Sequence, residues 1–251
     1  MIIAQISDTH IDLDREDSVS RIQDLERCVK DINGLGILPD VVIHTGDLAH
    51  NGTVEKYLKA AEVFDKLLCP LFIAAGNRDN RVALSATLPN SCSILNNTSY
   101  IQYSVDKFPV RLVAIDTLSQ TTNMGDFCEV RADSLRRMLS ENKTKPTAIF
   151  MHHPPFEINQ SKHKWQFDSQ EAIIDFEKAL EGHMQIVRVF CGHSHREAVG
   201  VTAGIPASCS PSIALNLRLG EFPDAAATTP VYQIHRYGSQ SGFSTETRIV
   251  N

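Results

Sequence analysis

Short runs of hydrophobic residues recur along the first 190 positions of the chain, and segments with helical periodicity separate them. These runs predict buried β-strands. Apolar residues three and four positions apart predict helices between them, the first of which is capped by Asp17 or Ser18. The predicted strands cover 2–6, 41–45, 71–75, 100–105, 110–116, 147–151 and 186–190, and the predicted helices cover 18–34, 54–67, 131–142 and 171–180. This alternation favours an α/β protein whose ligands bind beyond the carboxyl ends of the strands.

The pattern changes after residue 195, where the hydrophobic runs become shorter and turn residues punctuate them. Runs at 197–201, 205–208, 212–217, 231–236 and 243–249 predict five short strands. We expect these strands to form a second, mostly antiparallel sheet.

The length of 251 residues and the hydrophobic content of 42% are sufficient for one domain with a full core. We therefore expect a single domain over residues 1–251. Within it, the polar stretch at 156–170 has two interpretations. It is either a lid or substrate wall, which is a frequent use of long loops, or a solvated surface loop.

Charge and cysteine content exclude several classes of function. The formal net charge of −6 argues against a stable nucleic-acid complex or an anionic membrane as partner. No apolar stretch approaches the roughly 18 residues that cross a bilayer, and the N-terminal residues are typical of a strand and not of a signal peptide. The six cysteines are scattered without a CxxC pair, which suits a reducing compartment. We expect a cytoplasmic protein.

Polar side chains that can bind metals follow five of the predicted strands. Residues two positions apart on an extended segment point to the same side, so each such pair can face one place. Taken singly, each is also compatible with a helix cap or a solvated loop, and His44, inside a run, is typical of a buried core histidine. The side chains at the strand ends are Asp8 and His10, Asp47, Asn77, His152, and His193 with His195.

Seven oxygen and imidazole donors are enough for two metal ions that share a bridging carboxylate. Mixed donors of this kind suit divalent or trivalent ions such as Mn, Fe, Co or Zn. The set contains no thiolate, which argues against a structural zinc site. The sequence therefore predicts two metal ions as cofactors.

Five ordered motifs carry a family resemblance. They are SDTH (7–10), GDLAHNG (46–52), GNRD (76–79), MHHPP (151–155) and CGHSH (191–195). With them the sequence resembles the calcineurin-like metallophosphoesterases over essentially its whole length, and among these the bacterial class III cyclic-nucleotide and glycerophosphodiester phosphodiesterases. The resemblance implies an α/β fold, a four-layer αββα sandwich of two mixed β-sheets flanked by helices.

The resemblance also implies a role for each motif residue. Asp8, His10 and His195 would hold one metal, Asn77, His152 and His193 the other, and Asp47 would bridge them. His152 is preferred to His153 because the family's ligand stands two residues before the proline at 154. The implied activity is hydrolysis of small phosphodiesters by a hydroxide that bridges the metals. Relatives are often dimers or larger, so a homo-oligomer is expected by analogy.

One position departs from the family pattern: Arg78 stands where most members have a histidine. Arginine cannot donate a proton as a general acid, but it can pair with phosphate oxygens. We interpret Arg78 as a phosphate-binding residue, with the leaving group protonated by water or by His153. The alternative is that Arg78 only pairs with Asp79 or another acid. The alternative activities are a phosphomonoesterase, a nucleotide pyrophosphatase or a non-catalytic scaffold.

Overall fold

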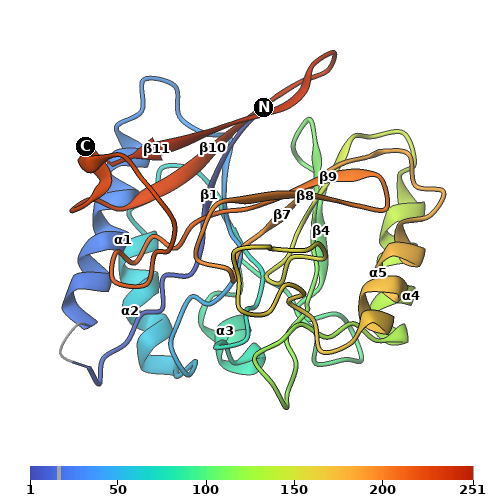
Figure 1. The fold of residues 1–251 in the computed structure, drawn as a ribbon, viewed down its shortest axis with the longest axis horizontal. Helices are drawn as coiled ribbons and strands as arrows, with labels where there is room; N and C mark the ends of the chain where they lie inside the picture. The colour runs from blue at the N-terminus through green and yellow to red at the C-terminus, as the bar shows by residue number, and fades with distance from the viewer. Residues whose placement is uncertain (16–17, 251) are drawn as a thin grey trace.

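Two β-sheets packed face to face form the centre of this computed structural model, and helices cover their outer faces (Figure 1). The structure describes residues 1–15 and 18–250. One sheet has five strands in the order β11-β10-β1-β2-β3, and the other has six in the order β4-β5-β6-β7-β9-β8. Both contain parallel and antiparallel pairs. The predicted α/β fold of two mixed sheets with flanking helices is confirmed.

The elements of the two sheets alternate with helices along the chain. The five-stranded sheet comprises β1 (Ile2–Ile6), β2 (Val41–His44), β3 (Leu71–Ile73), β10 (Val231–Gly238) and β11 (Gly242–Ile249). The six-stranded sheet comprises β4 (Tyr103–Val105), β5 (Arg111–Ala114), β6 (Thr147–Phe150), β7 (Ile186–Cys191), β8 (Ala198–Thr202) and β9 (Ile205–Cys209). The helices are α1 (Ser18–Asn33), α2 (Val54–Phe64), α3 (Arg81–Thr87), α4 (Glu129–Glu141), α5 (Gln170–Leu180) and the 3-10 helix η1 (Asp224–Ala226). In the described part of the chain, no helix combines the length and apolar character that crossing a membrane requires.

Every strand and helix predicted before residue 190 is present, with shifts of a few residues at the ends. α1 begins at Ser18, whereas Asp17, the other predicted cap, lies outside the described residues. The sequence pattern missed α3, because seven residues are too few for a helical periodicity. Its start is fixed instead by Asn80, whose side chain accepts a hydrogen bond from the backbone N–H of Ala83.

Three buried hydrophobic clusters fill the spaces between the four layers. α1 and α2 pack on the five-stranded sheet through a cluster that includes Leu25, and α4 and α5 pack on the six-stranded sheet through a cluster that includes Phe176. The third cluster lies between the sheets, where Ile3 of β1 shares a core with Phe190 of β7. The central strands are therefore covered on both faces, which explains their continuous apolar runs.

The strands after residue 195 do not form a sheet of their own, so that prediction was wrong. β10 and β11 extend the five-stranded sheet, with β10 antiparallel to β1. β8 and β9 extend the six-stranded sheet, and β9 runs parallel to β7. The physical reason is that β1 and β7 would otherwise be sheet edges with unpaired backbone groups, and the late strands pair with them.

The predicted strand at 212–217 is also wrong, because this segment forms a turn. Ser212 donates its hydroxyl proton to the carbonyl of Asp8, and the N–H of Ile213 donates to the carbonyl of Ser7. The apolar side chains of Ile213 and Ala214 are buried beneath the loop that leaves β1. Their hydrophobic run therefore reflects burial under a loop and not a strand.

The carboxyl ends of β1, β2 and β3 lie at one edge of the molecule because these strands are parallel, and the same holds for β5, β6 and β7 in the other sheet. Gln5 connects the two sheets beneath this edge. Its side-chain amide donates to Thr45 Oγ1 at 3.0 Å and to the carbonyl of Cys191 at 2.8 Å. The strand ends of both sheets thus face one common region.

Candidate metal centre

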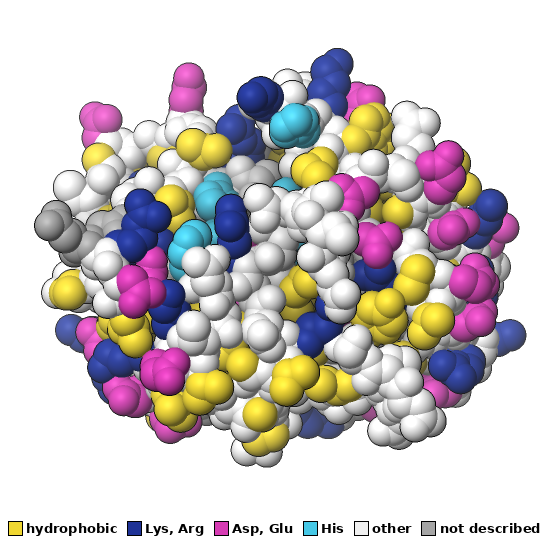
Figure 2. Space-filling view, turned by 90° about the horizontal axis from the view of Figure 1, so that it is seen from below, with side chains coloured by type: hydrophobic (Ala, Val, Ile, Leu, Met, Phe, Trp, Pro, Cys, Tyr) yellow, Lys and Arg dark blue, Asp and Glu magenta, His cyan; other side chains and the backbone are white. Residues whose placement is uncertain are grey.

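The structure brings all seven predicted ligand side chains together at the carboxyl ends of the strands. In three groups of His and Asp side chains, the potential ligand atoms lie within 4.8 Å of one another. The groups are Asp8 with His10 and His195, Asp8 with Asp47 and His152, and His152 with His153 and His193. Viewed from this edge, histidine side chains gather beside basic side chains in a hollow of the surface (Figure 2).

Several residues at the centre have a positive φ angle, a backbone conformation that residues other than glycine rarely adopt. Five of the eight non-glycine residues with positive φ in the described chain belong to the centre, with φ between 47° and 67°. They are Asp8, His10, Asp47, His193 and His195. Such conformations are disfavoured outside glycine and concentrate at functional sites. They turn these side chains inward immediately beyond the strand ends.

In the first half of the centre, three donor atoms surround one point. His10 Nε2 and His195 Nε2 lie 3.1 Å apart, and His195 Nε2 lies 3.3 Å from Asp8 Oδ1. Donor atoms held at about 2.1 Å by one cation lie about 3 Å from each other. Within the described residues, the buried Asp8 Oδ1 has no hydrogen-bond donor of good geometry. This donor set therefore fits a cation.

In the second half, an amide oxygen and two imidazole nitrogens converge. Asn77 Oδ1 lies 3.0 Å from both His152 Nε2 and His193 Nδ1, and these two nitrogens are 3.2 Å apart. Asp47 stands between the halves, with Oδ2 3.5 Å from His10 Nε2 and Oδ1 3.5 Å from His152 Nε2. The spacing again suits a cation.

Backbone groups orient the candidate ligand side chains. His152 donates from Nδ1 to the carbonyl of Thr45 at 2.8 Å, and His195 donates from Nδ1 to the carbonyl of Leu217 at 3.1 Å. In the neutral ring, each bond places the proton on Nδ1 and leaves Nε2 unprotonated and directed at the centre. His44 is not part of the centre: Thr9 and the N–H of Gly46 bind its ring nitrogens in the core.

Glycines at two strand ends allow the close approach of these segments. A Cβ on Gly192 would lie 2.1 Å from Ser7 Oγ, and a Cβ on Gly76 would lie 2.3 Å from Asp47 Oδ1. Any larger residue would push the strand ends apart.

The electrostatic environment favours a cation. Burial lowers the pKa of His10 to about 4 and that of His193 to about 3. At Asp47, burial acts to raise the pKa, but His152 and His10 hold it well below its usual value. Burial also opposes protonation of His152, yet Asp47 raises its pKa to about 9. The ionised carboxylate thus stabilises positive charge where the imidazole nitrogens converge.

Arg78 borders the centre, and its backbone N–H donates to Asp47 Oδ1 at 2.7 Å. Among the described residues, no carboxylate forms a salt bridge with its guanidinium. Asp79, the alternative partner, instead accepts hydrogen bonds from the backbone of Leu48, Ala49 and Gly76 and from the hydroxyl of Tyr57. The guanidinium is therefore available to a ligand.

His153 is buried, and both of its ring nitrogens face protein groups. Nδ1 lies 2.8 Å from Thr117 Oγ1, and Nε2 lies 3.2 Å from the carbonyl of Asn123. Burial, reinforced by the neighbouring His193, keeps its pKa well below the usual value. Its ring is therefore neutral and held in place.

Sequence reasoning assigned no role to His50, although GDLAHNG contains it. Its ring lies 6.1 Å from that of His10, and burial together with the charge of Arg78 lowers its pKa. The only sequence signal was its place three residues after Asp47.

The calcineurin-like phosphoesterase family matches residues 1–197 of the chain. The protein therefore belongs to this family of hydrolases, as the motifs predicted. It is 28% identical over 260 residues to the probable glycerophosphodiester phosphodiesterase GpdQ of Arcobacter nitrofigilis, covering 100% of this chain and 93% of that protein. It is 25% identical over 215 residues to a probable cyclic nucleotide phosphodiesterase of Vesicomyosocius okutanii, covering 85% and 86%.

Comparison of this structure with a solved structure also confirms the fold. The chain resembles a dimetal phosphatase from Danio rerio with a TM-score of 0.71 and 15% sequence identity, covering 100% of this chain and 99% of that one. At this identity the likeness shows the fold alone.

Proposed function

We propose that the protein hydrolyses small phosphodiesters with two metal ions held in the candidate centre. The observation that carries the proposal is the position of Asp47, whose two carboxylate oxygens each lie 3.5 Å from an imidazole nitrogen of a different half. This placement suits a carboxylate shared by two cations. Family membership and the names of the relatives support a phosphoester as substrate.

The proposed ligands divide as the two halves do. Asp8, His10 and His195 would hold one ion, Asn77, His152 and His193 would hold the other, and Asp47 would contact both. Mn, Fe, Co and Zn suit this mixture of oxygen and nitrogen donors. When bound, such a pair supplies an activated water and positive charge that offsets the charge of the phosphate. Because Asn77 is neutral, the loaded centre stays net positive toward an anionic diester.

Arg78 is proposed to bind the substrate phosphate. Its guanidinium has no salt-bridge partner among the described carboxylates. Arg78 also directly follows Asn77 in the sequence. Replacement of Arg78 with Ala should raise the KM by about 10-fold or more, the effect of one hydrogen bond to a charged group, and lower kcat less. Steady-state kinetics on a chromogenic diester measure both. A large loss of kcat at constant KM contradicts the role.

Water is the proposed proton donor to the leaving group. The sequence left water and His153 as candidate donors, and the ring nitrogens of His153 already face Thr117 and Asn123. Without a dedicated acid, the centre favours good or strained leaving groups, such as aryl diesters and cyclic nucleotides.

The deciding experiment combines metal analysis with a substrate panel. Protein stripped with a chelator and reloaded with Mn is assayed on bis(4-nitrophenyl) phosphate, 4-nitrophenyl phosphate and 2′,3′- and 3′,5′-cyclic nucleotides. We expect two metal ions per chain and faster hydrolysis of the diesters. Faster hydrolysis of the monoester would favour a phosphomonoesterase, and loaded protein that leaves every ester intact would favour a scaffold.

The segment at 156–170 is proposed to wall the substrate site. Its ends are anchored, because Phe156 and Phe167 are buried in the core of the six-stranded sheet. Arg196, next to His195, donates to the carbonyl of Gln160 at 3.0 Å.

A single domain, an assembly of several copies and a cytoplasmic location stay predictions.

A further inference from the structure

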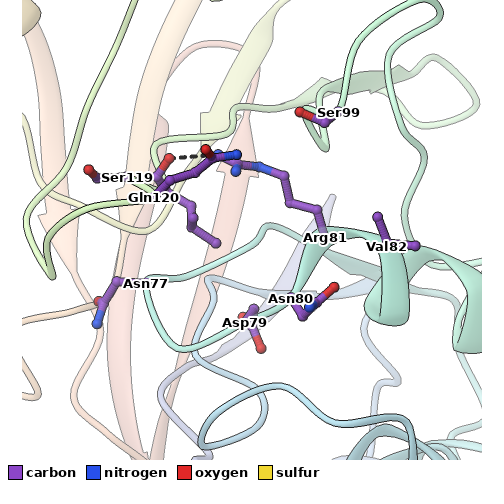
Figure 3. A pocket seen from close by; sticks show the side chains of 9 residues that line it. Asn77, Asp79, Asn80, Arg81, Val82, Ser99, Ser119 and Gln120 are labelled. Atoms are coloured by element: carbon purple, nitrogen blue, oxygen red, sulfur yellow. Dashed lines mark hydrogen bonds between the residues drawn. The ribbon is translucent and has the colours of Figure 1, made fainter.

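A cavity of about 380 Å³ opens beside the candidate metal centre. One wall is the turn after β3, which carries Asn77, and the opposite wall is the segment 118–120 after β5 (Figure 3). Asn77 belongs to both places, because its Oδ1 atom faces His152 and His193 while its side chain lines the cavity. A group bound in the cavity would therefore lie next to a phosphate bound at the centre.

A buried ion pair fixes the two walls relative to each other. Arg81 at the start of α3 donates to both carboxylate oxygens of Asp116, at 2.7 and 2.8 Å, and to the carbonyl of Leu118 at 2.6 Å. Figure 3 shows Arg81 extending from α3 across the cavity toward Ser119 and Gln120. The cavity is thus preformed, and the carboxylate neutralises the charge of Arg81.

The polar groups that remain for a ligand are neutral. The carboxylate of Asp79 already accepts four hydrogen bonds. Gln120 and Ser99 are exposed, and within the described part of the chain their side chains have no hydrogen-bond partner. These side chains can both donate to and accept from hydroxyl groups.

The cavity lacks the groups that other substrate arms require. None of the described residues that line it is aromatic, so it has no ring on which a nucleobase can stack. Arg81 is its only lining cation among the described residues, and Asp116 occupies that cation, so a second anionic group has no free partner. Its size lies near the lower end of the roughly 300–1,000 Å³ of ligand pockets, which suits a compact group.

We propose that this cavity binds the alcohol arm that the phosphate retains, and that it selects compact arms with free hydroxyl groups, such as glycerol. Gln120 is the specificity-determining residue, because its amide can bind two hydroxyl groups at once. The inference rests on the proposed function, since it takes Asn77 as a neighbour of the bound phosphate.

The test uses two diesters with the same leaving group and the same number of carbons in the other arm, glyceryl and propyl 4-nitrophenyl phosphate. For the Mn-loaded protein, we expect the glyceryl ester to have a KM about 10-fold lower, the effect of two neutral hydrogen bonds. Gln120→Leu should raise this KM about 5-fold and change that of the propyl ester less than 2-fold. Ser99→Ala should act in the same direction and less strongly.

Gln240→Leu is the matched control, because Gln240 is an exposed glutamine in the turn between β10 and β11. This turn lies at the amino end of β1, whereas the centre lies at its carboxyl end. Isothermal titration with the products provides a readout without turnover. Glycerol 3-phosphate should bind more tightly than propyl phosphate, and Gln120→Leu should remove most of that difference.

Equal KM values for the two esters in the wild type would overturn the subsite, and so would a Gln120→Leu effect of the same size on both. In either case hydrolysis of bis(4-nitrophenyl) phosphate continues, so the proposed function stands. If the loaded protein hydrolyses no diester at all, the proposed function fails, and this inference fails with it.

Discussion

The two sheets contribute different chemistry to the same centre. The five-stranded sheet supplies the oxygen donors together with one imidazole, and the six-stranded sheet supplies imidazoles alone. The first set is Asp8, His10, Asp47 and Asn77, and the second is His152, His193 and His195. Each half of the centre takes proposed ligands from both sheets, so neither sheet has a complete half of its own.

Hydrogen bonds between the two sheets also orient the side chains of the centre. His152 of the six-stranded sheet donates to the carbonyl of Thr45 in the five-stranded sheet. The N–H of His193 donates to Asp8 Oδ2 at 3.0 Å. The centre therefore depends on how the sheets are placed relative to each other, more than on the end of any single strand.

The largest effect is expected from Asp47, which faces both halves. Asp47→Asn keeps the shape but removes the negative charge, and we expect kcat on bis(4-nitrophenyl) phosphate to fall about 1,000-fold or more. Metal analysis should find less than two ions per chain. Asp65→Asn, at an exposed carboxylate that ends α2, should leave both values unchanged. Activity within 10-fold of the wild type with both ions retained would refute the bridging role.

A second experiment compares ligands of one half that come from different sheets. Asn77→Ala and His193→Ala each remove a donor from the same point. If both sheets complete that half, either variant should retain one ion per chain and lose at least about 100-fold in kcat, the upper end of the effect of losing an orienting partner. Elemental analysis decides the question. Retention of two ions by only one of the variants would show that its residue is not a ligand.

The sequence predicted the centre better than it predicted the connections around it. Each proposed ligand follows a buried strand, and the carboxyl ends of parallel strands meet at one edge, so strand periodicity alone brought Asp8, Asp47 and His193 into one region. The positive φ angles of these residues and the tautomers of the histidines were not predictable. They depend on contacts such as that between His152 and Thr45, which are 107 positions apart.

The errors have the same cause. Hydrophobic patterns show that a segment is buried, but they do not show which strand it pairs with. The first half of the run at 212–217 is buried beneath the loop that leaves β1, and the strands after 195 pair with two different sheets. The link through Gln5 was also missed, because a lone glutamine in an apolar strand has no local signal.

A third experiment weakens the link between the sheets without touching a proposed ligand. Gln5→Leu removes one of the two hydrogen bonds that the carbonyl of Cys191 accepts, since the N–H of Ser210 still donates to it, and leaves Nε2 of His235 without its partner. We expect the free energy of unfolding to fall by about 2–3 kcal/mol in urea titrations, because two buried groups lose a partner. kcat should fall by a smaller factor than in the ligand variants.

Gln233→Leu is the matched control for this variant. Gln233 of β10 is the register partner of Gln5, and it is also buried. Within the described residues its side-chain oxygen has no hydrogen-bond partner. If Gln233→Leu destabilises the protein as much as Gln5→Leu does, the loss of stability comes from replacing a buried amide and not from the hydrogen bonds of Gln5 between the sheets.

The smallest effect concerns the pH dependence of the same contact between sheets. His235 of β10 stacks on Phe190 of β7, with ring centroids 4.3 Å apart, and its Nε2 lies 2.9 Å from Gln5 Oε1. Burial, with a smaller effect of Arg188, lowers its pKa to about 3. The ordinary value of about 6.5 applies in the unfolded chain. Between these values the unfolded state binds a proton that the folded state does not, so stability falls as the pH falls from 6.5 toward 3.

At pH 5 this residue should cost about 2 kcal/mol of unfolding free energy relative to pH 7.5. His235→Gln cannot take up the proton, and its amide can still bind Gln5. The variant should therefore lose less stability than the wild type between pH 7.5 and pH 5 in urea titrations at the two values. The other buried histidines are present in both proteins, so the difference isolates His235. Equal losses would mean that the ring is protonated or solvated in the folded protein, and that the polar contact beneath the centre is open to water.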